Sequence, residues 1–328
     1  MRILVYGAGN IGSLYAGLLA NAGQDVSILA RDQRMSQIRE HGLVLEEFAS
    51  ARQTTVRPRG VERLEPDDVY DLIIVALSRE HVAEVLPILA RNRTPSVMFM
   101  GNSAAGPKAM VDAIGAERVL LGFPGAAGVP KGHAIRYLIL SAREQPTTIG
   151  ELDGTISPRL REIAATLQGA GFSVATCRRM DAWLKTHVAE ILPTACAFYM
   201  AAGDPQRLAR TRDALVLMVR SIREGYRVLR ANGIPIVPWK HRVFRWLPEP
   251  LLIAIMGRML ASEATAIKIG HGLAARNEMT VLAADFAALA NATSIETPAT
   301  QRLVRYLDPS VEPLADGSQK LSPHWRVA

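Results

Sequence analysis

Three glycines near the start of the chain have the spacing of a nucleotide-binding turn. They follow the apolar run 3–6 and precede a helix-like pattern, in the segment Gly7, Ala8, Gly9, Asn10, Ile11 and Gly12. In such a turn the first glycine allows a tight bend, the second lets the backbone approach a pyrophosphate, and the third lets helix and strand pack closely. The N–H groups at the start of the helix then face the phosphates. The pattern predicts a dinucleotide site, with a nucleoside site of the methyltransferase type as the alternative.

The residue after the second expected strand, 25–29, indicates which dinucleotide is favoured. An NAD site usually has an acidic residue there, which binds the ribose 2′-hydroxyl. This chain has Arg31, with Arg34 three residues further on. Because a guanidinium forms paired, charge-assisted bonds with a phosphate, Arg31 favours NADP(H). The alternative is that Arg31 is a solvated surface charge and Asp32 turns toward the ribose.

Apolar runs alternate with helical patterns through the first half of the chain. Helices are expected at 80–90 and 157–170, and continuous apolar runs between helices favour a parallel, doubly wound sheet. After the first two strands, further strands are expected at 72–76, 96–100, 119–123, 137–140, 147–151 and around 172–174. We expect 137–140 and 147–151 to form a late strand pair.

From Asp181 onward, strand patterns give way to long helical patterns. We expect these helices at 181–202, 206–232, 250–274 and 275–291. The predicted fold is an α/β Rossmann-type N-terminal domain, residues 1–178, followed by an all-α C-terminal domain, residues 179–308. The tail 309–328 contains Pro, Gly, Ser and Asp, and we expect it to be poorly ordered.

Composition excludes several classes of protein. The chain has 328 residues, a hydrophobic fraction of 49% and a net charge of +7. Its basic residues are scattered, which argues against nucleic acid and suits an anionic cofactor and an anionic substrate. Two cysteines, Cys177 and Cys196, provide neither a disulfide framework nor metal-ligand spacing, so no metal is expected. With no signal peptide and no membrane-spanning run evident, a cytoplasmic protein is expected.

The order of motifs across residues 1–308 resembles the ketopantoate reductase (2-dehydropantoate 2-reductase) family. The glycine turn and Arg31 match, as do the turn at Asn102, Thr148–Glu151 and the Thr297-Pro298 pair. The helix after the domain boundary carries Trp183-Leu184-Lys185 where that family has its catalytic lysine. Asn277-Glu278 before a late helix is similar to the family's Thr-Glu pair.

The resemblance implies reduction of a small 2-keto acid, ketopantoate or a related compound, with NADPH, in pantothenate biosynthesis. It implies that Lys185 is the general acid and that Glu278 binds the substrate hydroxyl or positions the lysine. Without the resemblance, Lys185 is most simply a surface lysine and Glu278 a helix N-terminal glutamate. Asn102, at the carboxyl end of a strand, is expected to face the nicotinamide or the substrate, although a simple turn residue is the alternative.

The chain departs from the family pattern in the substrate half. Two asparagines that follow the family's lysine are Ala189 and Pro193 here, and a serine before the glutamate is Ala266. Pro193 is expected to kink or shift its helix. These departures leave the substrate open. A non-catalytic NADP(H)-binding redox sensor and an opine- or hydroxyacid-type dehydrogenase therefore remain alternatives.

Polar and apolar groups specific to this chain are the remaining candidates. His271 lies seven residues before Glu278, so a continuous helix would place both on one face, where His271 could replace a lost substrate contact. His187 and Glu190 are spaced as an i,i+3 pair and are most simply a surface contact. Trp239 and Trp246 are expected to pack in the core rather than to form a lid. The apolar run 251–255 could be buried between two subunits of a homodimer.

Overall fold

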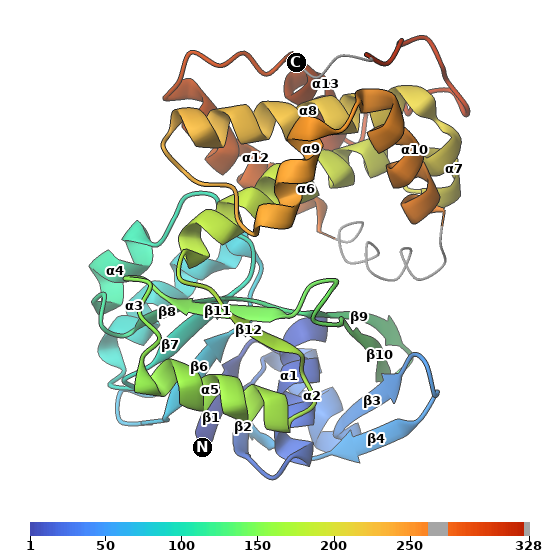
Figure 1. Cartoon of the computed structure of the whole chain (residues 1–328). Coiled ribbons are helices and arrows are strands. Elements are labelled where there is room, and N and C mark those ends of the chain that lie inside the picture. The colour runs from blue at the N-terminus through green and yellow to red at the C-terminus, as the bar shows by residue number, and fades with distance from the viewer. Residues whose placement is uncertain (262–274, 325–328) are drawn as a thin grey trace. The chain divides into compact units, whose positions relative to one another are not determined.

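The computed structural model describes residues 1–261 and 275–324 (Figure 1). It divides into two compact units. The first contains residues 1–101 and 106–181, and the second contains residues 102–105 and 182–328. The sequence predicts the domain boundary at 178/179, and the main division in the structure follows Asp181.

The first unit is built on an eight-stranded sheet. In spatial order its strands are β12 (Val174–Thr176), β11 (Thr147–Glu151), β8 (Val119–Phe123), β7 (Val97–Met100), β6 (Leu72–Val75), β1 (Arg2–Tyr6), β2 (Asp25–Leu29) and β5 (Arg59–Val61). All pairings from β8 to β5 are parallel, whereas β11 is antiparallel to β8. Taken from β5, the parallel part has the doubly wound order 3-2-1-4-5-6. This confirms the predicted α/β class.

The apolar runs of the central strands form these pairs because both faces of the sheet are covered. Ile3, Leu72, Val97 and Val119 on neighbouring strands are almost completely buried. The helices of this unit are α1 (Asn10–Asn21), α2 (Asp32–His41), the short 3-10 helix η1 (Arg79–His81), α3 (Val82–Arg91), α4 (Lys108–Ile114) and α5 (Pro158–Gly169). Ser157 caps α5 by accepting a hydrogen bond from the Leu160 amide, so this helix begins where its sequence predicts.

A second sheet was not predicted. It has four strands in the order β4 (Gln53–Val56), β3 (Leu43–Glu47), β10 (Ala134–Ile139) and β9 (Ala126–Lys131). The helix α1 packs against this sheet as well as against β1 and β2 (Figure 1). The expected pairing of 137–140 with 147–151 is therefore wrong: β10 pairs with β9 and β3, while β11 joins the large sheet. The strand β9, which is closer in sequence and forms a hairpin with β10, pairs with β10 in place of β11.

The described part of the second unit is helical. Its helices are α6 (Met180–Met200), α7 (Pro205–Arg210), α8 (Arg212–Ala231), η2 (Trp239–Arg242), α9 (Val243–Trp246), α10 (Glu249–Leu260), α12 (Arg276–Asn291), α13 (Pro298–Val304) and η3 (Arg305–Leu307). The single helix expected at 206–232 is broken at Thr211. The Thr211 hydroxyl donates to the Arg207 carbonyl at 2.7 Å, and Asp204 caps α7 through the amides of Gln206 and Arg207.

The C-terminal tail is held against α8, contrary to the expectation of poor order. Asp213 accepts hydrogen bonds from the amides of Lys320 and Leu321, at 3.0 and 2.7 Å. The Arg220 guanidinium donates to the Ser322 carbonyl at 2.7 Å. Buried and half-buried groups on α8 thus fix the tail as far as residue 324.

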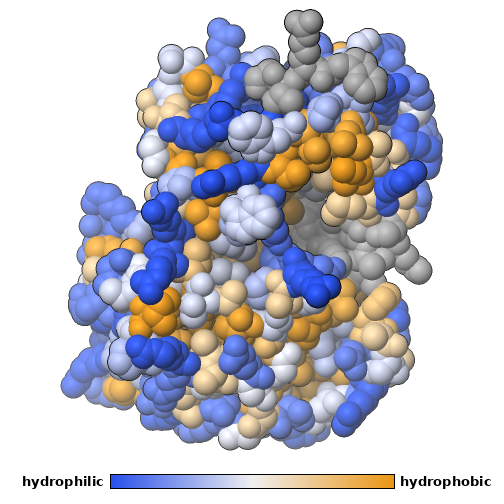
Figure 2. Space-filling view, in the orientation of Figure 1, coloured by the Kyte–Doolittle hydropathy of each residue, from blue (hydrophilic) through white to orange (hydrophobic). Residues whose placement is uncertain are grey.

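Apolar side chains remain exposed on one side of α10. Leu251, Ile255 and Met259 are 46%, 39% and 56% exposed, and Figure 2 shows hydrophobic residues gathered in this region. Their i, i+4, i+8 spacing places them on one face. No helix in the described ranges has the length and apolar character that a membrane crossing requires.

Candidate functional site

The glycine turn joins β1 to α1, and two of its glycines are required by the backbone itself. Gly7 has φ +112°, and a Cβ there would lie 2.6 Å from the Ala76 carbonyl oxygen at the end of β6. A Cβ on Gly12 would lie 1.9 Å from the Gly7 carbonyl oxygen. Any side chain at either position would therefore collide with backbone. These two glycines bring α1 close to the point between β1 and β6 where the strand order reverses, which is where ligands bind in sheets of this type.

Gly9 is different because nothing in the chain requires it. Its backbone, with φ −68° and ψ −173°, suits any residue, and a Cβ there would meet no atom within 4 Å. The helix that begins at Asn10 has neither a side-chain cap nor an acidic residue in its first turn. Open space over Gly9 and an uncapped helix N-terminus together fit the phosphates of a dinucleotide.

The two arginines that follow β2 differ in burial and in their contacts. Arg34 is half-buried and fastens the glycine turn: its Nε donates to the Ala8 carbonyl at 3.0 Å and its Nη2 to Ser13 Oγ at 2.9 Å. Burial lowers the pKa of Arg34. Arg31 is exposed at the N-terminus of α2, where β2 ends beside β1. Arg34 is thus engaged by the glycine turn, whereas Arg31, the residue that the sequence indicates for the 2′-phosphate, is exposed.

Within the second unit, Asn102 and Glu278 lie together although 176 residues separate them. Asn102 Nδ2 donates to Glu278 Oε1 at 3.3 Å. Glu278 stands in the first turn of α12 and is only 3% exposed. Asn102 Oδ1 is buried and has no hydrogen-bond partner among the described residues. Because buried acceptors are rarely left unpaired, this oxygen is the group in the pair that a bound ligand could satisfy.

Tyr199 at the end of α6 and Arg276 at the start of α12 add an aromatic and a basic group near Glu278. The Arg276 guanidinium lies 3.9 Å from the centre of the Tyr199 ring and donates to the Tyr306 carbonyl at 2.6 Å. Burial raises the pKa of Tyr199 to about 12, and the Glu278 carboxylate adds to this rise, whereas Arg276 opposes it. The phenol therefore stays neutral beside the carboxylate. Sequence reasoning singled out neither Tyr199 nor Arg276.

Lys185 lies on α6, half-buried, in the second turn of the helix. Ala189, one turn later, is 2% exposed and packs against Gly225 of α8, where a Cβ added to the glycine would be 3.0 Å from Ala189 Cβ. The position of a family asparagine is thus used here for close packing of two helices. The helix continues through Pro193 to Met200.

Glu190 is not the surface contact that its spacing predicted. Its carboxylate accepts a hydrogen bond from the Tyr226 hydroxyl and pairs with His241 Nδ1. The His187 ring stacks on Trp183, with ring centres 5.4 Å apart. The two Glu190 contacts join α6 to α8 and to η2, and the i,i+3 pattern alone could not have shown them.

Burial of His187 predicts a loss of stability in acid. Burial lowers the pKa of this histidine from 6.5 to about 4; the Glu190 carboxylate opposes the shift and His241 adds to it. Between these two values the unfolded chain takes up a proton that the folded chain does not, so the free energy of unfolding should fall as the pH drops from 6.5 toward 4. Denaturant unfolding at pH 7 and pH 4.5 measures this. The fall should be smaller in His187→Gln and unchanged in His81→Gln, which alters an exposed histidine; equal falls in all three proteins would contradict it.

The remaining candidate residues do not contribute to this site. His271 and Ala266 lie outside the described residues. Trp239 and Trp246 are 79% and 66% exposed, so the expectation of core packing is wrong for both. Among the described residues, no group of three or more His, Cys, Asp or Glu side chains could hold a metal ion.

The sheet order, the glycine turn and the uncapped helix that follows it define a Rossmann-type dinucleotide-binding protein with a second, helical unit. Residues 3–154 match the family "Ketopantoate reductase PanE/ApbA". Residues 3–154 are therefore similar to this ketopantoate reductase family, and the match ends before α6 begins.

Several relatives and solved structures are also similar to this chain. The 2-dehydropantoate 2-reductase of Halobacterium salinarum is 26% identical over 72% of this chain and 77% of its own length. That of Pyrococcus abyssi is 40% identical, but over only 26% of this chain and 27% of its own length. The PanE/ApbA family ketopantoate reductase of Ralstonia eutropha JMP134 superposes with a TM-score of 0.72 at 21% identity, covering 94% of this chain and 97% of its own. A D-mandelate dehydrogenase superposes with a TM-score of 0.75 at 15% identity, covering 94% and 98% of the two chains.

Proposed function

We propose that this protein uses NADPH to reduce the carbonyl of a small 2-keto acid to the 2-hydroxy acid. The Asn102–Glu278 pair carries the proposal, because it combines a buried carboxylate with a buried, unpaired amide oxygen. Such a pair can accept hydrogen bonds from a hydroxyl or a carboxamide. Ketopantoate is the first substrate to test, since the relatives from Halobacterium salinarum and Aquifex aeolicus are named 2-dehydropantoate 2-reductase.

The first unit supplies the cofactor site in this proposal. The open face of Gly9 and the N-terminus of α1 would hold the pyrophosphate, and Arg31 would bind the 2′-phosphate that distinguishes NADPH from NADH. Arg34 stabilises the turn through its hydrogen bonds to the Ala8 carbonyl and to Ser13 Oγ. When bound, NADPH supplies the hydride.

The second unit supplies the proton and the substrate contacts. Lys185 would donate the proton to the carbonyl oxygen, because a lysine in a half-buried setting can act as a general acid and can stabilise a developing alkoxide. Glu278 would accept a hydrogen bond from the substrate hydroxyl or hold Lys185 in position. Asn102 would position Glu278 through its amide group and present Oδ1 to the substrate or to the nicotinamide.

Oxidation of NADPH, followed at the nicotinamide absorbance band, tests the proposal. We expect turnover with ketopantoate or with a related 2-keto acid in a panel that includes bulkier side chains. The panel is needed because Ala189 is used for helix packing where the family has a polar group. Binding of NADPH without oxidation across the panel would contradict the proposal and favour a redox sensor. Turnover that requires an added amine would favour an opine-type dehydrogenase.

Removal of the Arg31 charge should change cofactor choice. Arg31→Gln should raise the KM for NADPH by about tenfold or more, because a charge-assisted phosphate contact is lost, and should leave the KM for NADH nearly unchanged. Steady-state kinetics with each cofactor measures this. Arg39→Gln, which removes an exposed arginine within α2, is the matched control. Equal effects of Arg31→Gln on the two cofactors would show that Arg31 does not bind the 2′-phosphate.

A further inference from the structure

The second unit contains a cavity of about 530 Å³ that shares no residue with the proposed catalytic site. It lies between α8 and the segment from Pro235 to Glu249, and the tail reaches it at His324. Its volume falls within the range of small-molecule sites. The feature that sets it apart is its charge, because six arginines line it: Arg220, Arg223, Arg227, Arg230, Arg242 and Arg245.

The spacing of these arginines along the chain places their side chains around the same cavity. Arg220, Arg223, Arg227 and Arg230 follow one another at intervals of three and four residues, so they occupy a single face of α8. Arg242 and Arg245 come from η2 and α9, which also line the cavity. Two separate stretches of chain therefore present guanidinium groups to the same cavity.

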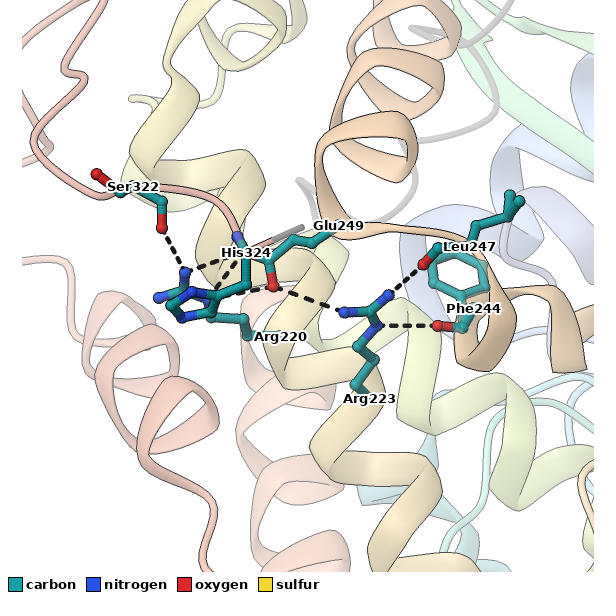
Figure 3. Close-up of polar contacts among 7 residues, drawn as sticks. All are labelled: Arg220, Arg223, Phe244, Leu247, Glu249, Ser322 and His324. Carbon is teal, nitrogen blue, oxygen red and sulfur yellow. Dashed lines mark hydrogen bonds and ion pairs between the residues drawn. The ribbon is translucent and has the colours of Figure 1, made fainter. Parts of the chain in front are cut away.

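The two carboxylates that line the cavity are already engaged. Glu249, 2% exposed, accepts hydrogen bonds from Arg220 Nε and Nη2 at 3.1 and 2.9 Å and lies 3.7 Å from Arg223 Nη1 (Figure 3). Glu224 accepts hydrogen bonds from the amides of Ala299 and Thr300 at the start of α13. Arg223 also donates to the carbonyls of Phe244 and Leu247, which ties α9 to α8 (Figure 3). Arg220 and Arg223 are thus structural.

The other four arginines have no carboxylate partner within the described ranges. Arg227, Arg230, Arg242 and Arg245 are all exposed to solvent, and Arg245 rests on the Trp246 ring, 5.0 Å from its centre. Their mutual repulsion is evident at Arg230, whose pKa is lowered by burial and by the charges of Arg245 and Arg227. Like charges in one cavity repel one another, and a bound anion would relieve this repulsion.

The cavity also has an apolar side. Ile236 is buried and Pro235 half-buried, whereas the Trp246 ring is 66% exposed and lines the cavity beside the arginines. An exposed indole next to guanidinium groups can stack on a planar group. The combination suits a ligand with a strongly anionic end and a planar or apolar end.

We propose that this cavity binds a small, multiply charged phosphate ester that carries a planar group, such as a nucleoside polyphosphate. Guanidinium groups bind phosphate oxygens in a paired, planar geometry, and four of them without carboxylate partners match several charges on one ligand. A concave site with arginines on two sides favours a small molecule over an extended anionic surface. Binding here is independent of the NADPH turn in the first unit.

Isothermal titration calorimetry of the full chain with ATP as the probe tests this inference, with and without saturating NADPH. We expect binding that NADPH does not abolish and that weakens as salt is added. Inorganic tripolyphosphate should bind more weakly than ATP, because it has no planar group for Trp246. Arg227→Gln/Arg230→Gln and Arg242→Gln/Arg245→Gln should each weaken ATP binding by about tenfold or more.

Arg302→Gln/Arg305→Gln is the matched control, because it removes two exposed arginines of the second unit that do not line the cavity. This variant should bind ATP as the unmodified chain does. Thermal unfolding of all variants reports their folding, and Arg220 and Arg223 are left intact because they hold Glu249. ATP binding that NADPH removes, or that the cavity variants do not weaken, would overturn the proposal. So would binding to vesicles of anionic lipid with no binding of ATP.

Discussion

Replacement of Lys185 by alanine should lower kcat for reduction of the 2-keto acid by about 10²- to 10⁴-fold, the usual contribution of a general acid. The Kd for NADPH should change little, because Lys185 itself has no proposed contact with the cofactor. Single-turnover kinetics and NADPH fluorescence titration separate the two effects. Equal losses of turnover and of cofactor affinity would contradict the role of Lys185 as proton donor.

Two further variants refine this test. Lys185→Arg keeps the positive charge, but arginine does not release its proton near neutral pH, so turnover should remain low if proton transfer is the function of Lys185. Recovery of turnover in Lys185→Arg would instead indicate that only the charge matters. Lys108→Ala, which removes an exposed lysine paired with Asp112, should leave both kcat and NADPH affinity unchanged.

Gly9→Ala should weaken NADPH binding without changing stability, whereas Gly12→Ala should lower the stability of the fold. The Cβ of Gly9→Ala would enter open space, so stability should be unchanged, while NADPH affinity should fall by about tenfold or more because a methyl group would occupy the space over the turn. The Cβ of Gly12→Ala would lie 1.9 Å from the Gly7 carbonyl oxygen. That variant should lose about 1–3 kcal/mol of stability or more, since the helix must move away from the strand.

Denaturant unfolding and NADPH titration of both variants make the comparison. Gly169→Ala is the control, because its Cβ also meets no atom within 4 Å and its position lies in α5, away from the turn. It should change neither measurement appreciably. If Gly9→Ala binds NADPH as tightly as the unmodified chain, the space over Gly9 is not the pyrophosphate site.

The sequence by itself determined the core of the first unit and the residue types of the turn. The apolar runs at 72–76 and 119–123 became β6 and β8 because a strand covered on both faces must be apolar along its whole length. Gly7 and Gly12 could be recognised because a tight turn and a close helix leave no room for a side chain. These are local requirements, and each is expressed within a few residues of the chain.

The tertiary structure decided which side chains meet. It showed that Arg34 fastens the turn while Arg31 stays exposed, although both follow the same strand. It paired β10 with β3, some ninety residues earlier in the chain, in a sheet that no local sequence pattern predicted. It also brought Asn102 to Glu278 across 176 residues.

The same holds for the charged groups of the helical unit. The i,i+3 spacing of His187 and Glu190 suggested a surface contact, whereas the fold pairs Glu190 with Tyr226 and His241. Six arginines line one cavity because α8 repeats four of them on one face and η2 and α9 add two more. Backbone conformation and burial follow from short-range periodicity, but the partner of a polar side chain depends on how distant segments pack, and only the folded chain specifies that.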